Sequence, residues 1–470
     1  MLATKVLASL LVALSPSWAA GAEASSAFST SIASGASHQP NSTTPFSTRM
    51  LSSIILRQQG LVSSGQSTST LESGLISLAI QSWLSLYASP SATATTTTTG
   101  QAQNSLSGNF SNYVDSILAS LSSMASFTNV TKTALLPLDR LTVAQAIHNL
   151  EFQESDSDVP TAPGNQTGNG GGSTHRELTM AEAVALDTLN ASLAIQERNQ
   201  YGGFWYYVYP SWSYLDGTVS FLPFMASQPT FFLPADALLQ IQLLYTNAAH
   251  PSGLLAHGYD ASKTAVWANN ATGASPYVWG RSMGWYLAGL VNAWEILTTT
   301  SSLTNEANDV ASQCNAVAGG CDALVAAIQA QFTQLVSVLV RYADPATGAW
   351  WQLPTLPSAP GNYLESSSTA LFTFAILKGL RLNLPSPIHD SNNTTELLKA
   401  TALRAYKYTT EKFVVDYGNG TLGYNNTVTV CSLNSTASYE YYVCQPINFN
   451  APLGAAAFSL ASLEVERLGL

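Results

Sequence analysis

Apolar residues recur every three or four positions through most of the chain, which is the spacing of one buried face of a helix. The pattern predicts helices at Leu71–Tyr87, Phe110–Met124, Val143–Phe152, Ala181–Ile195, Ala235–Leu244, Ser282–Leu297, Asp322–Tyr342, Glu365–Leu382, Thr395–Phe413 and Ala451–Leu468. Few runs alternate in the way that strands do. Helices joined by loops in this way indicate an all-α fold, either a solenoid or a closed toroid. The lack of a fixed repeat period counts against a solenoid.

Segments rich in small and polar residues interrupt this pattern. Residues 23–70 are rich in Ser, Thr, Gln and Ala, which predicts a mobile arm, and a Thr-rich run follows at 95–99. Residues 155–173 contain Asp, Pro, Asn and a run of three glycines, so we expect a loop insertion there. The predicted organisation is therefore an arm at 23–70 and one helical domain at 71–470.

The first 22 residues have the composition of a secretory signal peptide. Lys5 gives the positive start, Val6–Leu14 the apolar centre, and Ala20–Ala22 a cleavage site of small residues. Eleven Asn-x-Ser/Thr sequons point the same way, at Asn41, Asn109, Asn129, Asn165, Asn190, Asn270, Asn392, Asn393, Asn419, Asn425 and Asn434. We therefore expect a secreted, extracellular glycoprotein.

Composition excludes several classes of protein. With 46% hydrophobic and 10% charged residues, the chain can bury a large core. After residue 14 no uninterrupted stretch of about 18 apolar residues suggests a membrane span. The net charge of −11 comes without a basic cluster, which argues against nucleic acid as a partner.

Four cysteines form two tight clusters. In an oxidising compartment their spacing favours pairing Cys314 with Cys321 and Cys431 with Cys444. Zinc is the weaker interpretation, because neither spacing is that of a zinc knuckle and no histidine lies near either pair in sequence. We therefore expect disulfides and no metal.

The aromatic residues gather in short stretches marked by Gly and Pro. These stretches are 202–207, 210–212, 277–285, 350–351 and 439–442. Flat rings beside a few carboxylates and an arginine are typical of carbohydrate recognition, because a ring face packs against the apolar face of a sugar. The pattern indicates a sugar-binding site built from loops, although single rings can equally plug the ends of helix pairs.

The order of these motifs resembles the unsaturated rhamnogalacturonyl hydrolases of glycoside hydrolase family 105, which are related to the unsaturated glucuronyl hydrolases of family 88. The motifs are Gly202-Gly203-Phe204-Trp205, Tyr214-Leu215-Asp216-Gly217, His257-Gly258-Tyr259-Asp260, Trp279-Gly280-Arg281-Ser282-Met283-Gly284-Trp285, Gly361-Asn362-Tyr363-Leu364-Glu365 and Ser438-Tyr439-Glu440-Tyr441-Tyr442. The match extends from about residue 135 to the C-terminus. It implies a six-hairpin (α/α)6 toroid with the active site in a bowl at one end.

The resemblance also implies the reaction. The substrate is an oligosaccharide with a 4,5-unsaturated uronic acid at its non-reducing end. Protonation at C4 gives a cation shared by C5 and the ring oxygen, water adds at C5, and the hemiketal opens and expels the aglycone. The resemblance implies no cofactor, and we expect a monomer.

Two aspartates match the catalytic positions of that family. Asp216, in the Leu-Asp-Gly turn, is expected to donate the proton and then to accept one from water. It must start protonated, which requires burial or a neighbouring charge to raise its pKa. Asp139 lies at the position of the family's second active-site aspartate. It is expected to influence the protonation of Asp216 or to bind sugar hydroxyls. An Asp ahead of a helix can also be a simple N-cap.

The remaining site residues are expected to hold the sugar. His257 is expected to hydrogen-bond it, and Arg281 to bind the uronate carboxylate. Trp279 and Trp285 are expected as stacking walls, with core packing as the alternative for each. Three tyrosines complete the expected set, namely Tyr206, Tyr214 and Tyr363.

The sequence departs from the family around the sugar subsites. Tyr206 and Tyr207 stand where relatives usually carry a His, and Tyr214 replaces a common Trp. Three hypotheses stay open: a hydrolase of unsaturated uronyl oligosaccharides from rhamnogalacturonan pectin, a hydrolase of ordinary saturated glycosides on the same toroid, and a non-catalytic sugar-binding protein.

Overall fold

The computed structural model describes residues 44–62, 68–88, 98–151, 176–299, 310–317, 319–385 and 395–470. The expected signal peptide, residues 23–43 of the expected arm and the expected loop at 155–173 lie outside these ranges. Residues 44–470 form one compact unit, in which the helical segments predicted from periodicity are helices.

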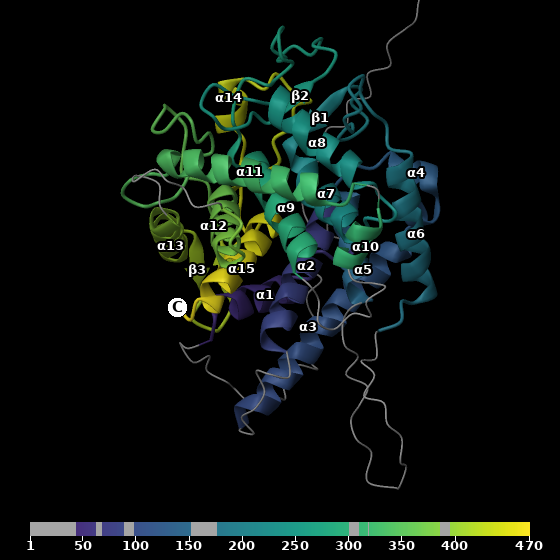
Figure 1. Ribbon diagram of the computed structural model, residues 1–470. Helices are drawn as coiled ribbons and strands as arrows, with labels where there is room; N and C mark the ends of the chain where they lie inside the picture. Colours follow the sequence, from purple (N-terminus) through teal and green to yellow (C-terminus); the bar gives the residue numbers. More distant parts are fainter. Residues whose placement is uncertain are drawn as a thin grey trace, which may run out of the picture. The chain divides into compact units, whose positions relative to one another are not determined.

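Six helices form a closed inner ring, in which each packs against the next and the last returns to the first. They are α2 (Thr70–Tyr87), α5 (Arg140–Leu150), α7 (Thr218–Ser227), α9 (Gly280–Thr298), α12 (Ser366–Arg381) and α15 (Pro452–Arg467). The outer helices are α1 (Phe46–Leu56), α3 (Thr98–Ser122), α6 (Met180–Ala194), α8 (Pro234–Asn247), α11 (Asp322–Leu339) and α13 (Thr395–Lys412) (Figure 1). This alternation is the expected (α/α)6 toroid.

The inner helices approach closely where their sequences supply glycine. A Cβ atom at Gly289 would lie 2.5 Å from the carbonyl oxygen of Thr218, and one at Gly284 would lie 2.8 Å from Cβ of Leu371. Larger residues at these two positions would force α7 and α12 away from α9. The close packing of α9 against both neighbours therefore requires residues without a side chain at Gly284 and Gly289.

The outer helices bury one stripe each. In α11 the buried stripe includes Leu324, Ile328, Phe332 and Leu335, which follow helical spacing and pack toward α8 and α9. By length and composition alone, segment Asp322–Tyr342 is apolar enough to cross a membrane, and it is the one such helix in the described ranges. In the toroid this segment packs as an outer helix.

The expectation of a core-free arm at 23–70 is wrong for helix α1. Met50, Leu51 and Ile54 are fully buried against α15 and α2, and the Trp83 indole donates a 2.8 Å hydrogen bond to Oγ1 of Thr48. The short apolar stripe of this helix was not recognised in the sequence because Ser and Thr residues surround it. Helix α1 is the outer helix that covers the contact between α15 and α2.

Short elements escaped the periodicity argument because they span too few residues. They include helices α4 (Val130–Ala134), α10 (Val310–Ala316) and α14 (Tyr439–Val443). Antiparallel pairs join β1 (Trp212–Tyr214) to β2 (Gly258–Asp260), β3 (Val414–Asp416) to β4 (Leu422–Tyr424), and β5 (Thr427–Val428) to β6 (Ile447–Asn448). The first pair lies at the end of the toroid where inner helices begin (Figure 1).

Two contacts show that neighbouring inner helices begin at the same end of the ring. Ser282, in the first turn of α9, bonds Asp216, which directly precedes α7. Arg281 of α9 bonds Ser367 in the first turn of α12. The amino-terminal ends of these helices therefore gather at one end of the ring.

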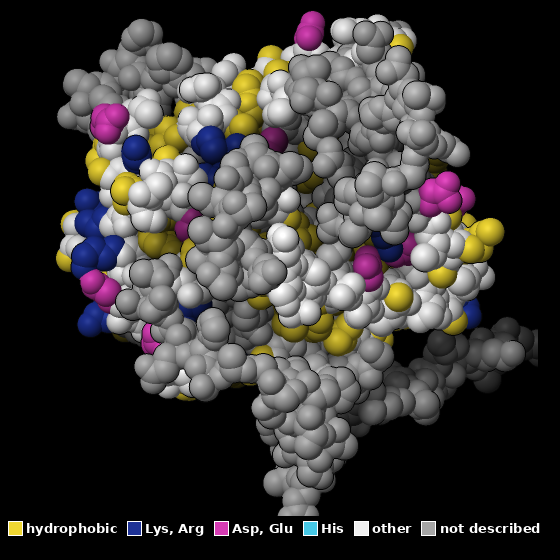
Figure 2. Space-filling model, turned by 90° about the horizontal axis from the view of Figure 1, so that it is seen from below, with side chains coloured by type: hydrophobic (Ala, Val, Ile, Leu, Met, Phe, Trp, Pro, Cys, Tyr) yellow, Lys and Arg dark blue, Asp and Glu magenta, His cyan; other side chains and the backbone are white. Residues whose placement is uncertain are grey.

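On the face seen from below, the described Lys, Arg, Asp and Glu side chains are interspersed and form no continuous basic patch (Figure 2).

One of the two expected disulfides is present. Cys314 and Cys321 are bonded, as predicted. The pairing of Cys431 with Cys444 is wrong, because both are free thiols. Cys431 is buried with its sulfur 3.6 Å from Nε2 of Gln352, whereas Cys444 is exposed just after α14. Closeness in sequence did not bring the two sulfur atoms together.

Candidate active site

Asp216 is positioned by the β1–β2 pair. Tyr214 pairs with Gly258, and the Leu215 amide donates a 3.1 Å hydrogen bond to the His257 carbonyl. The chain then makes one 3-10 turn, Leu215–Gly217, and enters α7. A Cβ atom at Gly217 would lie 2.9 Å from Cδ1 of Leu138, so the glycine lets this turn reach the segment that carries Asp139.

The Asp216 carboxyl is nearly buried among polar partners. Its Oδ2 atom accepts a 2.5 Å hydrogen bond from the Ser282 hydroxyl. The same oxygen lies 3.2 Å from Nε2 of His257, which makes no hydrogen bond of good geometry within the described residues. His257 is fully buried, and its Nδ1 lies 2.8 Å from the Tyr442 hydroxyl. The Asp216 carboxyl is therefore held by one hydroxyl donor and faces a buried imidazole nitrogen.

Asp139 immediately precedes α5 but does not cap it, because its side chain makes no capping hydrogen bond. Its Oδ2 accepts a 2.8 Å hydrogen bond from the Tyr206 hydroxyl, while its buried Oδ1 has no partner among the described residues. Burial raises the pKa of Asp139 to about 7. The Tyr206 hydrogen bond and the Arg140 charge act against that rise, and the charge of Asp216 adds to it.

A wall of aromatic rings encloses the two carboxyls. Tyr206 and Tyr214 stack with their ring centroids 4.5 Å apart, and Tyr209 continues the stack at 6.4 Å from Tyr214. Trp212 contacts both Tyr209 and Trp267, at 5.2 Å in each case. The Tyr214 hydroxyl is buried and makes no hydrogen bond of good geometry within the described ranges, although Ser432 and Leu433 lie close enough to act on its pKa.

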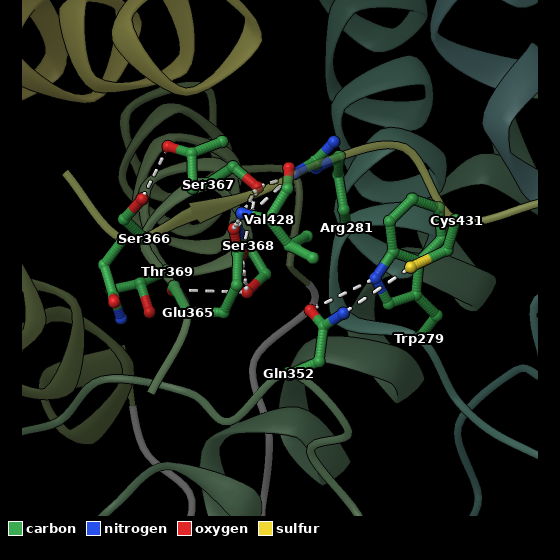
Figure 3. Close-up of polar contacts among 12 residues, drawn as sticks. Trp279, Arg281, Gln352, Glu365, Ser366, Ser367, Ser368, Thr369, Val428 and Cys431 are labelled. Carbon is green, nitrogen blue, oxygen red and sulfur yellow. Dashed lines mark hydrogen bonds and ion pairs between the residues drawn. The ribbon is translucent and has the colours of Figure 1, made fainter. Parts of the chain in front are cut away.

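Arg281 does not present a free cation, contrary to expectation. It is 2% exposed and lies 3.6 Å from the fully buried Glu365. Its Nε donates a 2.8 Å hydrogen bond to Ser367, and its Nη2 donates to the carbonyl of Val428 (Figure 3). The guanidinium therefore joins α9, α12 and the strand β5 and is not open to a substrate carboxylate.

The other aromatic residues expected in the site lie in different surroundings. Trp279 packs beside His257 at 4.7 Å and donates to Gln352 at 3.2 Å, so it belongs to the site (Figure 3). Trp285 lies one turn into α9 and is buried in the main core, which favours the core-packing alternative. The Tyr363 hydroxyl is buried without a partner in the described part of the chain.

Several residues of the site were not singled out from the sequence. They are Ser282, Tyr442, Glu365 and Trp267, of which the first three lie inside the quoted motifs. Their role appears only when residues distant in sequence meet, as Tyr442 and His257 do across 185 positions. Trp267 donates a 2.7 Å hydrogen bond to the Leu433 carbonyl and carried no sequence signal.

The site is suited to acid–base chemistry. It contains one carboxyl with a pKa near neutrality and a second that interacts with it electrostatically and accepts a hydroxyl donor. Two carboxyls held in different environments can divide the roles of proton donor and proton acceptor. Within the described ranges no three His, Cys, Asp or Glu side chains are grouped as metal ligands are.

Sequence comparison identifies relatives of this arrangement. The model of Glycosyl Hydrolase Family 88 matches residues 176–319 and 324–469. Protein Atu3128 of Agrobacterium fabrum and a 24.9 kDa protein in the picA locus of Rhizobium radiobacter are each 35% identical over 149 residues. That alignment covers 32% of this chain and 54% of each relative, so the chain spans about half the length of these curated relatives.

Solved structures share the fold. A family 105 glycoside hydrolase of C. acetobutylicum aligns with a TM-score of 0.64 and 23% identity over 90% of this chain and 100% of that one. The unsaturated glucuronyl hydrolase of Bacillus sp. GL1, responsible for the degradation of glycosaminoglycan, aligns with a TM-score of 0.51 and 11% identity over 90% and 94%. At these identities the likeness establishes the toroid.

Proposed function

Because the chain belongs to Glycosyl Hydrolase Family 88 and is therefore a glycoside hydrolase, we propose that it removes a 4,5-unsaturated uronic acid from the non-reducing end of oligosaccharides. Rhamnogalacturonan fragments are the proposed source of this substrate. The observation that carries the proposal is the buried pair Asp139 and Asp216, in which burial raises the pKa of Asp139 to about 7.

The pair enters the reaction with one proton. Burial raises the pKa of Asp139 to about 7 and so keeps that proton on Asp139 in mildly acidic solution, while Asp216 accepts a hydrogen bond from the Ser282 hydroxyl. Asp139 therefore donates to C4 of the unsaturated sugar, and Asp216 accepts a proton from the water that adds at C5. These roles are the reverse of those expected from the sequence, in which Asp216 donates the first proton.

The uronate carboxylate needs a partner other than Arg281. Helices α5 and α7 begin beside the two aspartates, and α9 begins at Trp279 next to His257. Helix amino-terminal ends carry partial positive charge, so their convergence favours an anionic group. We assign the carboxylate to this region.

The aromatic wall suits the rest of the sugar. Tyr206 and Tyr214 present a stacked pair beside the carboxyls, and Trp212 extends the wall toward the surface, since it is only partly buried. Ring faces of this kind pack against the C–H face of a pyranose. The wall therefore fits the unsaturated ring and the sugar that follows it.

The protein is further proposed to act outside the cell as a glycoprotein. The Cys314–Cys321 disulfide is consistent with an oxidising compartment. Sequon asparagines Asn109, Asn270, Asn419 and Asn434 are exposed and open to glycosylation. Mass spectrometry of protein secreted from a eukaryotic host, with and without deglycosylation, tests this proposal.

A substrate panel tests the catalytic proposal. Hydration of the conjugated double bond abolishes its ultraviolet absorbance, so decay is followed on lyase digests of rhamnogalacturonan and of glycosaminoglycans. Decay on the first alone supports pectin specificity. Reducing-sugar release from saturated oligosaccharides, without decay on any lyase digest, would favour an ordinary glycosidase. Binding without turnover would favour a non-catalytic role.

A further inference from the structure

A second pocket lies within the inner ring, toward the carboxyl-terminal ends of its helices. It has a volume of about 340 Å³ and takes residues from all six inner helices, among them Gln81, Gln145, Pro223, Asn292, Lys378 and Leu460. Gln145 follows Asp139 by six positions on α5, which is about 9 Å along the helix axis. Val219 follows Asp216 by only three positions, but neither aspartate nor His257 lines the pocket, so it is lined by other residues than the site.

A chain of side-chain amides crosses one wall and ends on an unused acceptor. Asn149 donates to Gln81 at 3.1 Å, and Gln145 donates to Asn149 at 2.7 Å. The remaining oxygen, Oε1 of Gln145, is buried and has no partner among the described residues, and the residue is only 6% exposed. A buried acceptor left in this state costs free energy that a hydroxyl or N–H donor would recover.

An ion pair lines another wall without adding net charge. Nζ of Lys378 lies 2.7 Å from both Oδ1 of Asn292 and Oε2 of Glu295. Although burial acts to raise it, Lys378 and Arg381 lower the pKa of Glu295 to about 2, so the pair stays charged. An ammonium has three N–H donors, so one donor of Lys378 can serve a bound oxygen.

The rest of the pocket is apolar. Leu75, Phe374 and Leu460 are buried and line it. Pro223 has no N–H to donate to the Val219 carbonyl, which loses its usual helical partner, and both residues line the pocket. The carboxyl-terminal ends of helices disfavour an anion, and the Lys378–Glu295 pair lines the pocket without a net charge that would attract an ion of either sign.

We propose that this pocket binds a neutral pyranose. The unused acceptor of Gln145 and the spare donor of Lys378 match hydroxyl groups, and the apolar wall matches the C–H face of the ring. A pocket of about 300 to 1,000 Å³ is the usual size for a small ligand. This binding site is separate from catalysis and does not depend on the proposed substrate.

Calorimetric titration of the full chain with D-galactose, L-rhamnose and D-galacturonate tests the proposal. A neutral sugar should bind at least 10-fold more tightly than D-galacturonate. The Gln145→Met variant keeps the side-chain length but removes the acceptor, together with the donor to Asn149, so it should lose at least 10-fold in affinity while it keeps hydrolase activity. Asp216→Asn, which alters the other site, should bind the neutral sugar as the wild type does.

Three results would overturn the assignment. They are no binding of either neutral sugar, unchanged affinity in Gln145→Met, or loss of binding in Asp216→Asn but not in Gln145→Met, which would place the sugar at the aspartates. If Gln145→Met does not unfold cooperatively, crystals of the wild type soaked in D-galactose replace it. Density for the sugar against Gln145 would support the assignment, and its absence there would refute it.

Discussion

The hydroxyl of Tyr206 donates a 2.8 Å hydrogen bond to one oxygen of Asp139, while the other oxygen of that carboxyl has no partner within the described ranges. The hydrogen bond favours the carboxylate and burial favours the acid, and burial is the larger influence. Asp139 therefore keeps its proton to about pH 7 and has a free oxygen for a reacting group.

Tyr206→Phe should move the alkaline limit of activity. Removing a hydrogen bond to a charged group costs the carboxylate about 1.5 to 3 kcal/mol, so the pKa of Asp139 should rise by about one to two units. Activity that needs the protonated acid should then persist to higher pH, as measured by the pH profile of kcat. Tyr214→Phe is the control for this shift, because the hydroxyl that bonds Asp139 is that of Tyr206 and not that of Tyr214. An unmoved limit in Tyr206→Phe would contradict this role.

Asp139 should also give the fold a pH-dependent stability. Its pKa of about 7 in the folded state exceeds the unfolded value of about 3.9, so the folded state binds more protons between these values. The stabilising contribution is complete below about pH 4 and is lost as the pH rises through about 7. Urea unfolding across this range should show a declining free energy for the wild type that flattens in Asp139→Asn. Parallel curves would refute the raised pKa.

The Arg281–Glu365 pair should matter for stability. Both side chains are almost fully buried, so Arg281→Met leaves the Glu365 charge without its cation and should cost about 3 to 5 kcal/mol of unfolding free energy. The control is the exposed Lys407–Glu411 pair, where Lys407→Ala should cost less than about 1 kcal/mol. Equal losses of unfolding free energy in the two variants, measured by urea unfolding, would show that the buried Arg281–Glu365 ion pair does not stabilise the fold more than an exposed pair.

The two free thiols should react at different rates. Cys444 is exposed, whereas Cys431 is 2% exposed and burial raises the pKa of its thiol to about 12. Native protein should take up one iodoacetamide label, at Cys444, and a second only in denaturant. The Cys444→Ser variant should take up none while native. Failure to label either thiol in denaturant without reductant would instead show that the two are paired.

Much of the fold was predictable because long helices repeat one pattern many times. The ranges expected around α2, α9, α11 and α12 agree with the structure to within a few residues. Helix α1 was missed because its few apolar residues sit among Ser and Thr, and β1 and β2 were missed because three residues carry no period. Helix α7 was missed because its residues are apolar on all sides and include a proline.

The site was predictable to the extent that each residue acts alone. The motifs located Asp139, Asp216 and His257, which the structure brings to one end of the toroid. Sequence could not show that Arg281 is neutralised by Glu365, since that pairing joins two helices 84 positions apart. Nor could it show which hydroxyl each aspartate meets, Tyr206 for Asp139 and Ser282 for Asp216, since both partners lie more than 60 positions away.

The most direct test of the account compares three proteins in one assay. Wild type, Asp139→Asn and Asp216→Asn are each mixed with lyase-digested rhamnogalacturonan, and the loss of ultraviolet absorbance of the unsaturated uronate is followed. Loss of a general acid or base should slow the decay about 10²- to 10⁴-fold in each variant. Wild-type decay in Asp139→Asn, with decay abolished only in Asp216→Asn, would contradict the assignment of the proton to Asp139. No decay with the wild type would contradict the proposed reaction itself.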